Sequence, residues 1–242
     1  MKKFIFDIDG TITPSRKQMD FSFMAWFIIF ECNYSVYLVT GSDRKKTIEQ
    51  VGLDVYNRAK RVYNCAGNDI YERDNLVYRN PWRLSEEAKD FLLNELSESQ
   101  FPLKTGNHIE ERSGCVNFSI LGRNALFEER EIYKEWDEIH NERTCIADRF
   151  NAEFPELFAF VGGETGVDIS SKGSDKGQII RDFSFDDELH FFGDRMDEKG
   201  NDYPLAIEVK KRGGYTYHVK NWEDTRTKLE EFTTLPSELI NV

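Results

Sequence analysis

The sequence predicts an α/β fold, in which a Rossmann-like, doubly wound parallel sheet carries an inserted α+β domain with an antiparallel sheet of its own. Near both ends of the chain, short apolar segments alternate with helical ones, which is typical of a parallel sheet covered by helices. In the middle this rhythm gives way to paired segments that alternate apolar and polar residues, as antiparallel strands do. We therefore expect a core of residues 1–82 and 174–242 and an inserted domain of residues 83–173.

The first part of the core alternates strands and helices. Its strand segments are short and apolar, and many of their residues are β-branched or aromatic: residues 3–7, 35–42 and 61–67. Residues 17–32 are apolar on most faces, as expected of a helix packed on a sheet. Residues 43–52 begin with a capping aspartate and end with a glycine, which predicts a second helix.

The middle of the chain predicts a separate set of elements. Residues 69–79 read as a hairpin that turns at Asp74-Asn75, and residues 85–98 as a charged amphipathic helix. Residues 108–123 alternate like antiparallel strands with a turn near Ser113-Gly114. A long charged helix over 125–150 and a return to strand over 158–170 complete the inserted domain.

The last part of the chain returns to the first rhythm. We expect a helix over 175–183, a strand over 188–194 that ends in an acid, two short strands within 206–219 and a closing helix over 221–232. The last ten residues are expected to form a loosely held tail.

Composition limits the classes of function. The 242 residues are 39% hydrophobic and 31% charged, with a formal net charge of −12. Such a charge repels nucleic acids and anionic lipid, although a local basic pocket could still bind a small anion. The four cysteines form no C-x-x-C pair, which argues against zinc and fits a reducing compartment. The most apolar window, residues 21–30, is too short to cross a bilayer, and no signal peptide is visible. We therefore expect a cytoplasmic protein.

The stretch "FIFDIDGTITP" at residues 4–14 carries the strongest chemical signal. Because side chains repeat every two residues in a strand, Asp7 and Asp9 point the same way at the carboxyl end of the first strand, where open α/β sheets bind ligands. Two adjacent carboxylates suit magnesium, and one can act as a nucleophile while the other moves a proton. An aspartate-rich turn that caps a helix is the alternative.

Further candidates lie after later strands. The segment "FFGDRMDEKGND" offers Asp194, Asn201 and Asp202 as further oxygen ligands, unless it is a solvated surface loop. Lys176, at the start of a predicted helix, could neutralise a phosphate, and Ser42 (or Thr40) could hydrogen-bond one after the second strand.

In this order, the aspartate pair, the Ser/Thr, the lysine and the late acids resemble the haloacid dehalogenase (HAD) superfamily of phosphoryl-transfer enzymes. Within it, five segments look like the eukaryotic-type phosphomannomutases: "FDIDGTITPSRKQM", "IEERSGCVNFSILGRNALFEER", "DKG" at 175–177, "FFGDRMDEKGND" and "EDTR" at 223–226. The likeness runs from about residue 3 to residue 232. The second segment is the most specific, because the superfamily varies most in its inserted domain.

The resemblance implies a phosphomannomutase of GDP-mannose biosynthesis, which interconverts mannose 6-phosphate and mannose 1-phosphate with Mg²⁺ and a hexose 1,6-bisphosphate activator. Asp7 would take the phosphoryl group as an aspartyl-phosphate, and Asp9 would act as general acid and base. The insertion would be a mobile cap that excludes water. The implied metal ligands are Asp7, Asp9, Asp194, Asn201 and Asp202.

The implied substrate contacts combine core and cap. They are Arg16, Ser42, Arg112, Arg123, Arg130, Gly166, Asp168 and Lys176. Arginine grips phosphate bidentately, but the three cap arginines could instead pair with nearby glutamates: Glu110, Glu111, Glu128 and Glu129.

Three places depart from the family, and the mildest change is Ala66-Gly67-Asn68, which replaces the family's Glu-Asn-Gly turn. Gly166 stands where the family usually has a serine, two residues before the aspartate matched by Asp168, so the preferred hexose is open. His108 replaces an aromatic residue at the family's cap-to-cap contact, which leaves a homodimer through the cap less secure. Two other functions stay open: a sugar-phosphate phosphatase on the same scaffold, and a non-catalytic protein that binds sugar phosphates or a partner.

Overall fold

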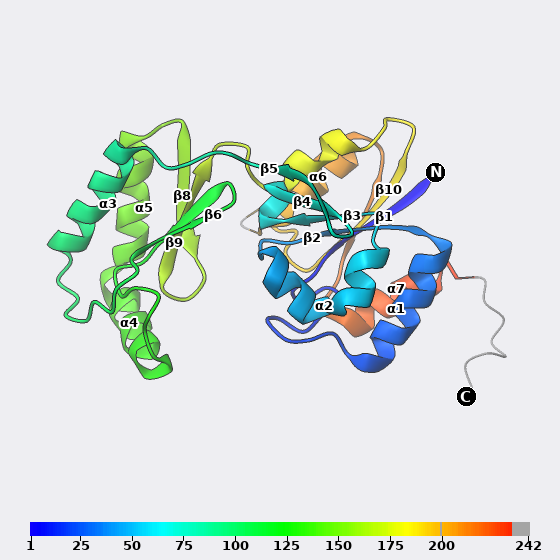
Figure 1. The fold of residues 1–242 in the computed structure, drawn as a ribbon, viewed down its shortest axis with the longest axis horizontal. Helices are drawn as coiled ribbons and strands as arrows, with labels where there is room; N and C mark the ends of the chain where they lie inside the picture. Colours follow the sequence, from blue (N-terminus) through cyan, green and yellow to red (C-terminus); the bar gives the residue numbers. More distant parts are fainter. Residues whose placement is uncertain (199, 234–242) are drawn as a thin grey trace. The chain divides into compact units, whose positions relative to one another are not determined.

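The computed structural model describes residues 1–198 and 200–233, which fall into two compact units. One unit contains Met1–Arg79 and the chain from Asp175 onward, and the other contains Asn80–Ser174 (Figure 1). The tail expected at the end of the chain lies, from residue 234, outside the described residues. Within the described residues, no helix is both long enough and apolar enough to cross a membrane.

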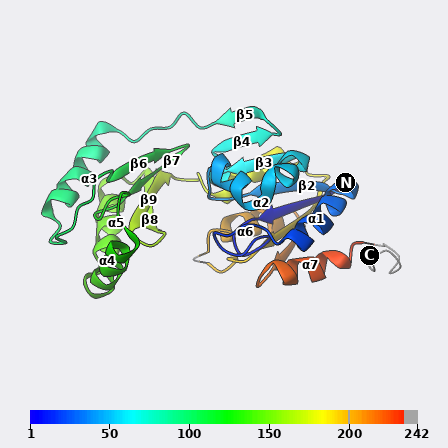
Figure 2. The same cartoon turned by 60° about the horizontal axis from the view of Figure 1, so that its bottom comes forward.

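The first unit is built on a seven-stranded sheet of order β11-β10-β1-β2-β3-β4-β5. Neighbours from β11 to β3 pair in parallel, and β3, β4 and β5 pair antiparallel, so a hairpin extends the parallel sheet at one edge (Figure 2). The strands are β1 (Lys2–Asp7), β2 (Ser35–Val39), β3 (Arg61–Asn64), β4 (Asp69–Glu72), β5 (Asn75–Arg79), β10 (Glu188–Gly193) and β11 (Tyr215–His218).

Helical segments cover both faces of this sheet. The helices are α1 (Phe21–Asn33), α2 (Arg44–Arg58), α6 (Tyr203–Lys211) and α7 (Trp222–Glu230), with 3₁₀ turns η1 (Cys65–Gly67) and η2 (Lys176–Asp182). Phe4 and Phe6 of β1 pack with α1, α2 and α7, whereas Ile5 packs with η2 and α6 on the other face. This alternation within one strand is that of a sheet buried on both sides.

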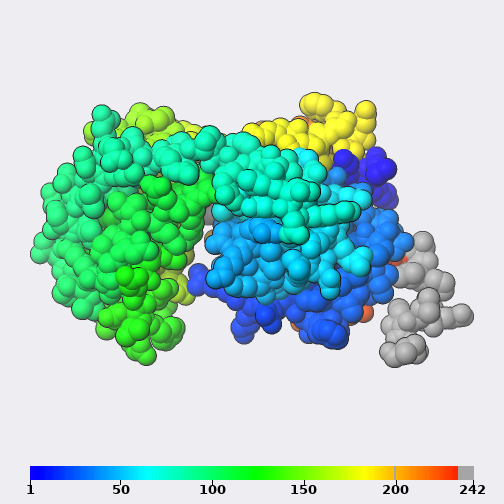
Figure 3. All heavy atoms as spheres, in the orientation of Figure 1, coloured from blue at the N-terminus to red at the C-terminus, as the bar shows by residue number. Residues whose placement is uncertain are grey.

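The second unit packs three helices on one face of a four-stranded antiparallel sheet of order β6-β7-β9-β8. Its helices are α3 (Glu86–Glu98), α4 (Phe127–His140) and α5 (Glu142–Glu153), and its strands are β6 (Ile109–Arg112), β7 (Cys115–Phe118), β8 (Leu157–Gly162) and β9 (Gly166–Ser171). Its residues, turquoise to yellow-green in Figure 3, form one continuous body. A parallel core sheet with an inserted α+β unit confirms the predicted fold class.

Two predicted helices differ at their boundaries. Helix α1 starts at Phe21 rather than at residue 17, because the Asp20 side chain accepts hydrogen bonds from the Ser22 and Phe23 amides and caps it there. Helix α2 begins after its predicted cap, Asp43, but continues beyond Gly52 to Arg58. Gly52 has a φ of 79° and a ψ of 156°, so it interrupts the helix without ending it.

Two predicted elements in the insertion are divided. The long helix over 125–150 breaks at Asn141, whose left-handed backbone (φ 51°, ψ 32°) separates α4 from α5. The strand over 158–170 is a hairpin of β8 and β9, joined at residues 163–165.

Near the end of the chain one predicted helix is confirmed and one predicted strand was wrong. The helix expected over 175–183 is a 3₁₀ helix over residues 176–182. The first of two strands expected within 206–219 is part of α6, which has Pro204 in its first turn and buries Leu205, Ala206 and Val209 along one face. The β-branched Ile207 and Val209 favoured a strand, but the spacing of the buried residues is helical.

Candidate active site

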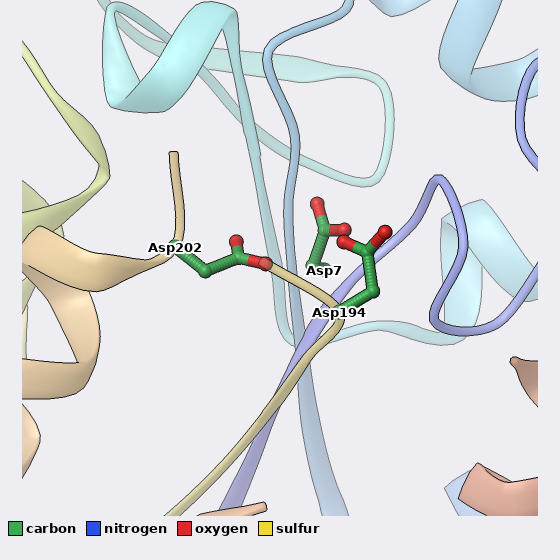
Figure 4. Close-up of side chains that lie close together, drawn as sticks. All are labelled: Asp7, Asp194 and Asp202. Carbon is green, nitrogen blue, oxygen red and sulfur yellow. The ribbon is translucent and has the colours of Figure 1, made fainter. Parts of the chain in front are cut away.

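Three carboxylates meet where two neighbouring parallel strands end. Asp7 is the last residue of β1, Asp194 follows β10, and Asp202 immediately precedes α6. Each offers an oxygen within 4.8 Å of the others, and Figure 4 shows the three side chains reaching toward a common point. Since β1 and β10 pair in parallel, their carboxyl ends lie at one edge of the sheet. The fold therefore concentrates negative charge at the edge where such sheets bind ligands.

Lys176 is buried between two of these acids. Its Nζ donates to Asp7 Oδ1 at 2.5 Å and to Asp202 Oδ1 at 2.7 Å, and its side chain is 1% exposed. Burial alone would lower the pKa of Lys176, but the carboxylates of Asp202 and Asp7 together raise it. The ammonium therefore stays charged and neutralises part of the acidic cluster.

The cluster retains more negative charge than Lys176 can offset. Burial is the main cause that raises the pKa of Asp7; the Lys176 ammonium opposes it, and the charges of Asp202 and Asp194 add to it. Burial and Asp202 likewise raise the pKa of Asp194. When all three carboxylates ionise, one ammonium leaves two uncompensated negative charges, so burial and this charge together raise the pKa values of Asp7 and Asp194. The carboxylate oxygens are hard ligands. A magnesium ion therefore fits this group of residues.

The turn after β1 leaves room for the side chain of Asp194. Gly10 has a φ of 79°, and a Cβ at this position would lie 2.4 Å from Asp194 Oδ2. The Thr11 hydroxyl in the same turn donates to Asp7 Oδ2 at 3.3 Å. The glycine and threonine of the "DGT" sequence thus serve the acidic cluster directly, one by leaving space and one by a hydrogen bond.

Asp9 lies beside this cluster in the sequence but has different partners. Its Oδ1 accepts from the backbone N–H of Arg16 at 2.6 Å and from Gln50 Nε2 at 2.8 Å. Its carboxylate is not among the three grouped acids. The structure thus divides the predicted pair into one carboxylate inside the acidic cluster and one held by amide donors.

The residues after β2 lie near the same strand ends. Val39, the last residue of β2, pairs with Asp7 of β1. Thr40 is buried, and its hydroxyl accepts from the half-buried Ser42 N–H at 3.0 Å. Ser42 thus follows the strand next to the one that ends at Asp7, and the Thr40 hydroxyl shapes its turn.

The predicted metal ligand Asn201 is exposed in the turn before α6, whereas its neighbour Asp202 is fully buried. Arg16 is exposed in the loop between β1 and α1, with a left-handed φ of 58°.

In the second unit, Glu110 brings two of the predicted arginines together. Its Oε2 accepts from Arg112 at 2.5 Å and pairs with Arg123 Nε at 3.1 Å. Arg130, in the first turn of α4, donates through Nε to the Ala125 carbonyl at 3.3 Å. The pairing with a glutamate considered from the sequence is thus present for two of the three arginines.

Asp168 and Gly166 lie on β9 beside Asn117 of β7. Asn117 Nδ2 donates to Asp168 Oδ1 at 2.7 Å. A Cβ at Gly166 would lie 2.5 Å from that same Nδ2. The Asn117 amide thus occupies the space that a side chain at position 166 would need, which gives the glycine at this position a local physical reason.

His108 is half-buried, and its Nδ1 lies 2.9 Å from the Ser119 carbonyl oxygen. This is a contact within its own unit.

Sequence reasoning missed four residues: Thr11, Gln50, Asn117 and Thr225. The buried Thr225 donates to the Thr11 carbonyl at 2.6 Å and so ties α7 to the turn beside Asp7. Thr11, Asn117 and Thr225 fall inside motifs that were singled out from the sequence, so proximity to those motifs was a usable signal. Gln50 gave none, because only the packing of α2 places its amide against Asp9.

Known proteins resemble this chain over most of its length. Residues 27–235 match the family model described as eukaryotic phosphomannomutase. The chain belongs to this enzyme family. A phosphomannomutase from Dendrobium officinale is 32% identical over 91% of this chain and 90% of its own length. One from Saccharomyces cerevisiae is 31% identical over 96% of this chain and 94% of its own. The predictions of an enzyme and of this family are thereby confirmed.

Solved structures share the fold. A haloacid dehalogenase-like hydrolase from Bacteroides thetaiotaomicron superposes with a TM-score of 0.66 at 13% identity, over 96% of this chain and 99% of its own. A trehalose-6-phosphate phosphatase related protein gives a TM-score of 0.57 at 17% identity, over 95% of this chain and 96% of its own. At such identities the likeness concerns the fold alone.

Proposed function

We propose that this protein is a phosphomannomutase that interconverts mannose 6-phosphate and mannose 1-phosphate through a phosphorylated Asp7. The observation that carries the proposal is the environment of Asp7: a buried carboxylate at a parallel strand end, held by Lys176 and flanked by Asp194 and Asp202. Membership of the phosphomannomutase family supports the choice of reaction and substrate.

The proposed reaction has two balanced halves. Asp7 attacks phosphorus in a hexose 1,6-bisphosphate, the bond from phosphorus to the sugar oxygen breaks, and Asp9 gives that oxygen a proton. A hexose monophosphate then binds with its phosphate at the distal position. Asp9 removes the proton from its free hydroxyl, the hydroxyl oxygen attacks phosphorus on Asp7, and the Asp7 carboxylate is released as a hexose 1,6-bisphosphate forms. This bisphosphate turns over before Asp7 attacks again, which exchanges its two phosphates. Each half returns Asp9 to the protonation state that the other half needs.

Other side chains would bind and orient the substrate. Lys176 holds Asp7 in place and offsets charge, and Ser42 would donate to the transferring phosphoryl group. Arg112, Arg123, Arg130 and Arg16 would hold the distal phosphate, with Asp168 at the sugar hydroxyls. Such contacts position the reacting atoms and lower the entropic cost of the transfer. The Glu110 carboxylate would then share Arg112 and Arg123 with the phosphate.

Magnesium would be held by the carboxylates of Asp7, Asp194 and Asp202 and, when bound, would offset charge on the phosphoryl oxygens. The second unit would act as a cap that keeps water from phosphorylated Asp7, since hydrolysis there turns a mutase into a phosphatase. A cytoplasmic location and a homodimer through the cap remain part of this proposal.

A coupled assay tests the proposal. With Mg²⁺ and saturating hexose 1,6-bisphosphate, mannose 1-phosphate should be converted to mannose 6-phosphate faster than inorganic phosphate is released. Phosphate release in excess of isomer formation would instead identify a sugar-phosphate phosphatase. Absence of both activities, with Asp7→Asn binding sugar phosphates as wild type does, would identify a non-catalytic binding protein. Borohydride trapping followed by mass spectrometry should locate the acyl phosphate on Asp7.

A further inference from the structure

Gln50 joins helix α2 to the segment between β1 and α1 at two points. Its side chain is buried, and its Nε2 donates to Asp9 Oδ1 at 2.8 Å. Its main-chain carbonyl accepts from the Met19 N–H at 2.8 Å. One residue of α2 therefore holds both the carboxylate of Asp9 and the far end of the loop that follows it.

The kink at Gly52 explains why the Gln50 carbonyl can serve this loop. In an uninterrupted α-helix this carbonyl would accept from the amide four residues later. Gly52 lies within that turn in a non-helical conformation, which breaks the ladder at this point. Its φ of 79° and ψ of 156° fall in a region that is almost restricted to glycine.

The two donors to Asp9 converge on one oxygen. Oδ1 accepts from Gln50 Nε2 and from the Arg16 backbone N–H, the latter at 2.6 Å. Hydrogen bonds to an ionised oxygen are strong and fix the plane of the carboxylate. They also occupy Oδ1, so Oδ2 is the oxygen that neither donor holds.

The cost of burying Gln50 argues that the amide serves a purpose other than stability. In the described part of the chain its Oε1 is buried with no hydrogen-bond partner. A buried, unsatisfied polar atom costs about 1–3 kcal/mol. An apolar residue of similar volume would avoid this cost but would leave Asp9 without its side-chain donor.

We propose that Gln50 is a positioning residue for proton transfer by Asp9. Together with the Arg16 N–H it occupies Oδ1 and orients Oδ2 toward the sugar oxygen, which receives the proton as its bond to phosphorus breaks and returns it in the second half of the reaction. This inference rests on the proposed function, in which Asp9 is the general acid and base.

Two substrates with different leaving groups can distinguish this positioning role of Gln50 from a purely structural role. Gln50→Met keeps the length of the side chain and removes the donor. Breaking an alkyl phosphate needs a proton from Asp9, whereas p-nitrophenolate leaves without one. The variant should therefore lose about tenfold or more in kcat with mannose 1-phosphate and less than about twofold in the initial release of nitrophenolate from p-nitrophenyl phosphate.

The ratio of these two rates is measured within each variant, so a smaller folded fraction cancels. Tyr56→Phe is the matched control, because it also removes a buried hydrogen bond from α2, the one from Asn64, away from Asp9. Its ratio should equal that of wild type. An unchanged ratio in Gln50→Met would overturn the inference, even if both rates fell.

A double-mutant cycle gives a second, independent answer. In an Asp9→Asn background, Gln50→Met should have little further effect on the mannose 1-phosphate rate, since the group it positions is already absent. Additive losses would contradict the inference. If wild type does not act on mannose 1-phosphate, the proposed function fails, and the leaving-group ratio is then taken with glycerol 2-phosphate as the alkyl substrate.

Discussion

Lys176 shows how one side chain can hold a group of buried acids together. Within residues 1–198 and 200–233, its ammonium is the only one that forms ion pairs with Asp7 and Asp202, and both of these partners are almost fully buried. Removing one member of a buried charge pair leaves the others uncompensated, which costs more than the pair itself contributes.

We expect Lys176→Met to lower the free energy of unfolding by about 3–5 kcal/mol in the presence of a chelator. Urea titration followed by circular dichroism measures this. Lys211→Met is the control, because Lys211 pairs with Glu208 at the surface, and surface pairs contribute about 0–1 kcal/mol. Equal losses in the two variants would contradict this account of Lys176.

Glu31 is a buried acid outside the candidate site. Both of its carboxyl oxygens are buried with no hydrogen-bond partner in the described chain. Burial raises the pKa of Glu31 to about 9, against the opposing charge of Arg58. The folded protein therefore keeps a proton that the unfolded chain releases above its ordinary pKa of 4.5. Stability from this residue falls as pH rises between these two values.

Glu31→Gln should remove this pH dependence. At pH 4 the variant and wild type should be about equally stable, and at pH 8 the variant should be more stable by on the order of 5 kcal/mol. Thermal unfolding at a series of pH values measures the difference. A difference that stays constant from pH 4 to pH 9 would show that Glu31 ionises normally in the fold.

At the scale of elements, the main difference between the predicted and the observed α2 is the kink at Gly52. The sequence pattern correctly placed Asp43 at its start and singled out Gly52, but interpreted Gly52 as the end of the helix. Local rules cannot distinguish a terminal glycine from a kink, because the helix resumes only through burial of Val55 and Tyr56 against the core.

Gly52→Ala should destabilise the protein by about 1–3 kcal/mol, although alanine is the better helix former. Space is not the cause, since a Cβ there would meet only Met24 at 3.4 Å. Gly41→Ala, where no positive φ and no close neighbour exist, should be neutral. If the Gly52 variant were as stable as wild type, the kinked backbone would not be required.

At the scale of the whole molecule, the net charge of −12 and the acidic cluster both destabilise the folded state through repulsion between like charges. Self-repulsion opposes folding, and a bound divalent cation would relieve it where it is strongest. Mg²⁺ should therefore raise the melting temperature. At one hundred times its dissociation constant, the gain would be about 2.7 kcal/mol.

Differential scanning fluorimetry with Mg²⁺ against a chelator tests this, with Asp194→Asn as the ligand variant. Glu223→Gln, on the exposed face of α7, controls for a general effect of lowering the net charge. The Asp194 variant should lose most of the shift, and the Glu223 variant should keep it. If Mg²⁺ still raised the melting temperature of both variants, the cation would bind at a site other than the acidic cluster.

The sequence by itself determined which chemistry-bearing residues exist and which elements carry them. A run of apolar residues ending in Asp7 reads as a buried strand wherever it lies, and "FFGD" places Asp194 at the end of another. Parallel pairing of such strands then brings their ends to one edge. The physical reason is that periodicity and capping act over a few residues, so a local pattern contains them.

Only the tertiary structure decided what those residues contact. It placed Lys176 between Asp7 and Asp202, which are 169 and 26 residues away in the chain. It also gave Asp9 the amide of Gln50, turned residues 206–211 into helix, and filled the space beside Gly166 with Asn117. These outcomes depend on burial and on contacts with residues distant in sequence. The free energy of such packing comes from many residues of the core together, so a local sequence pattern does not reveal it.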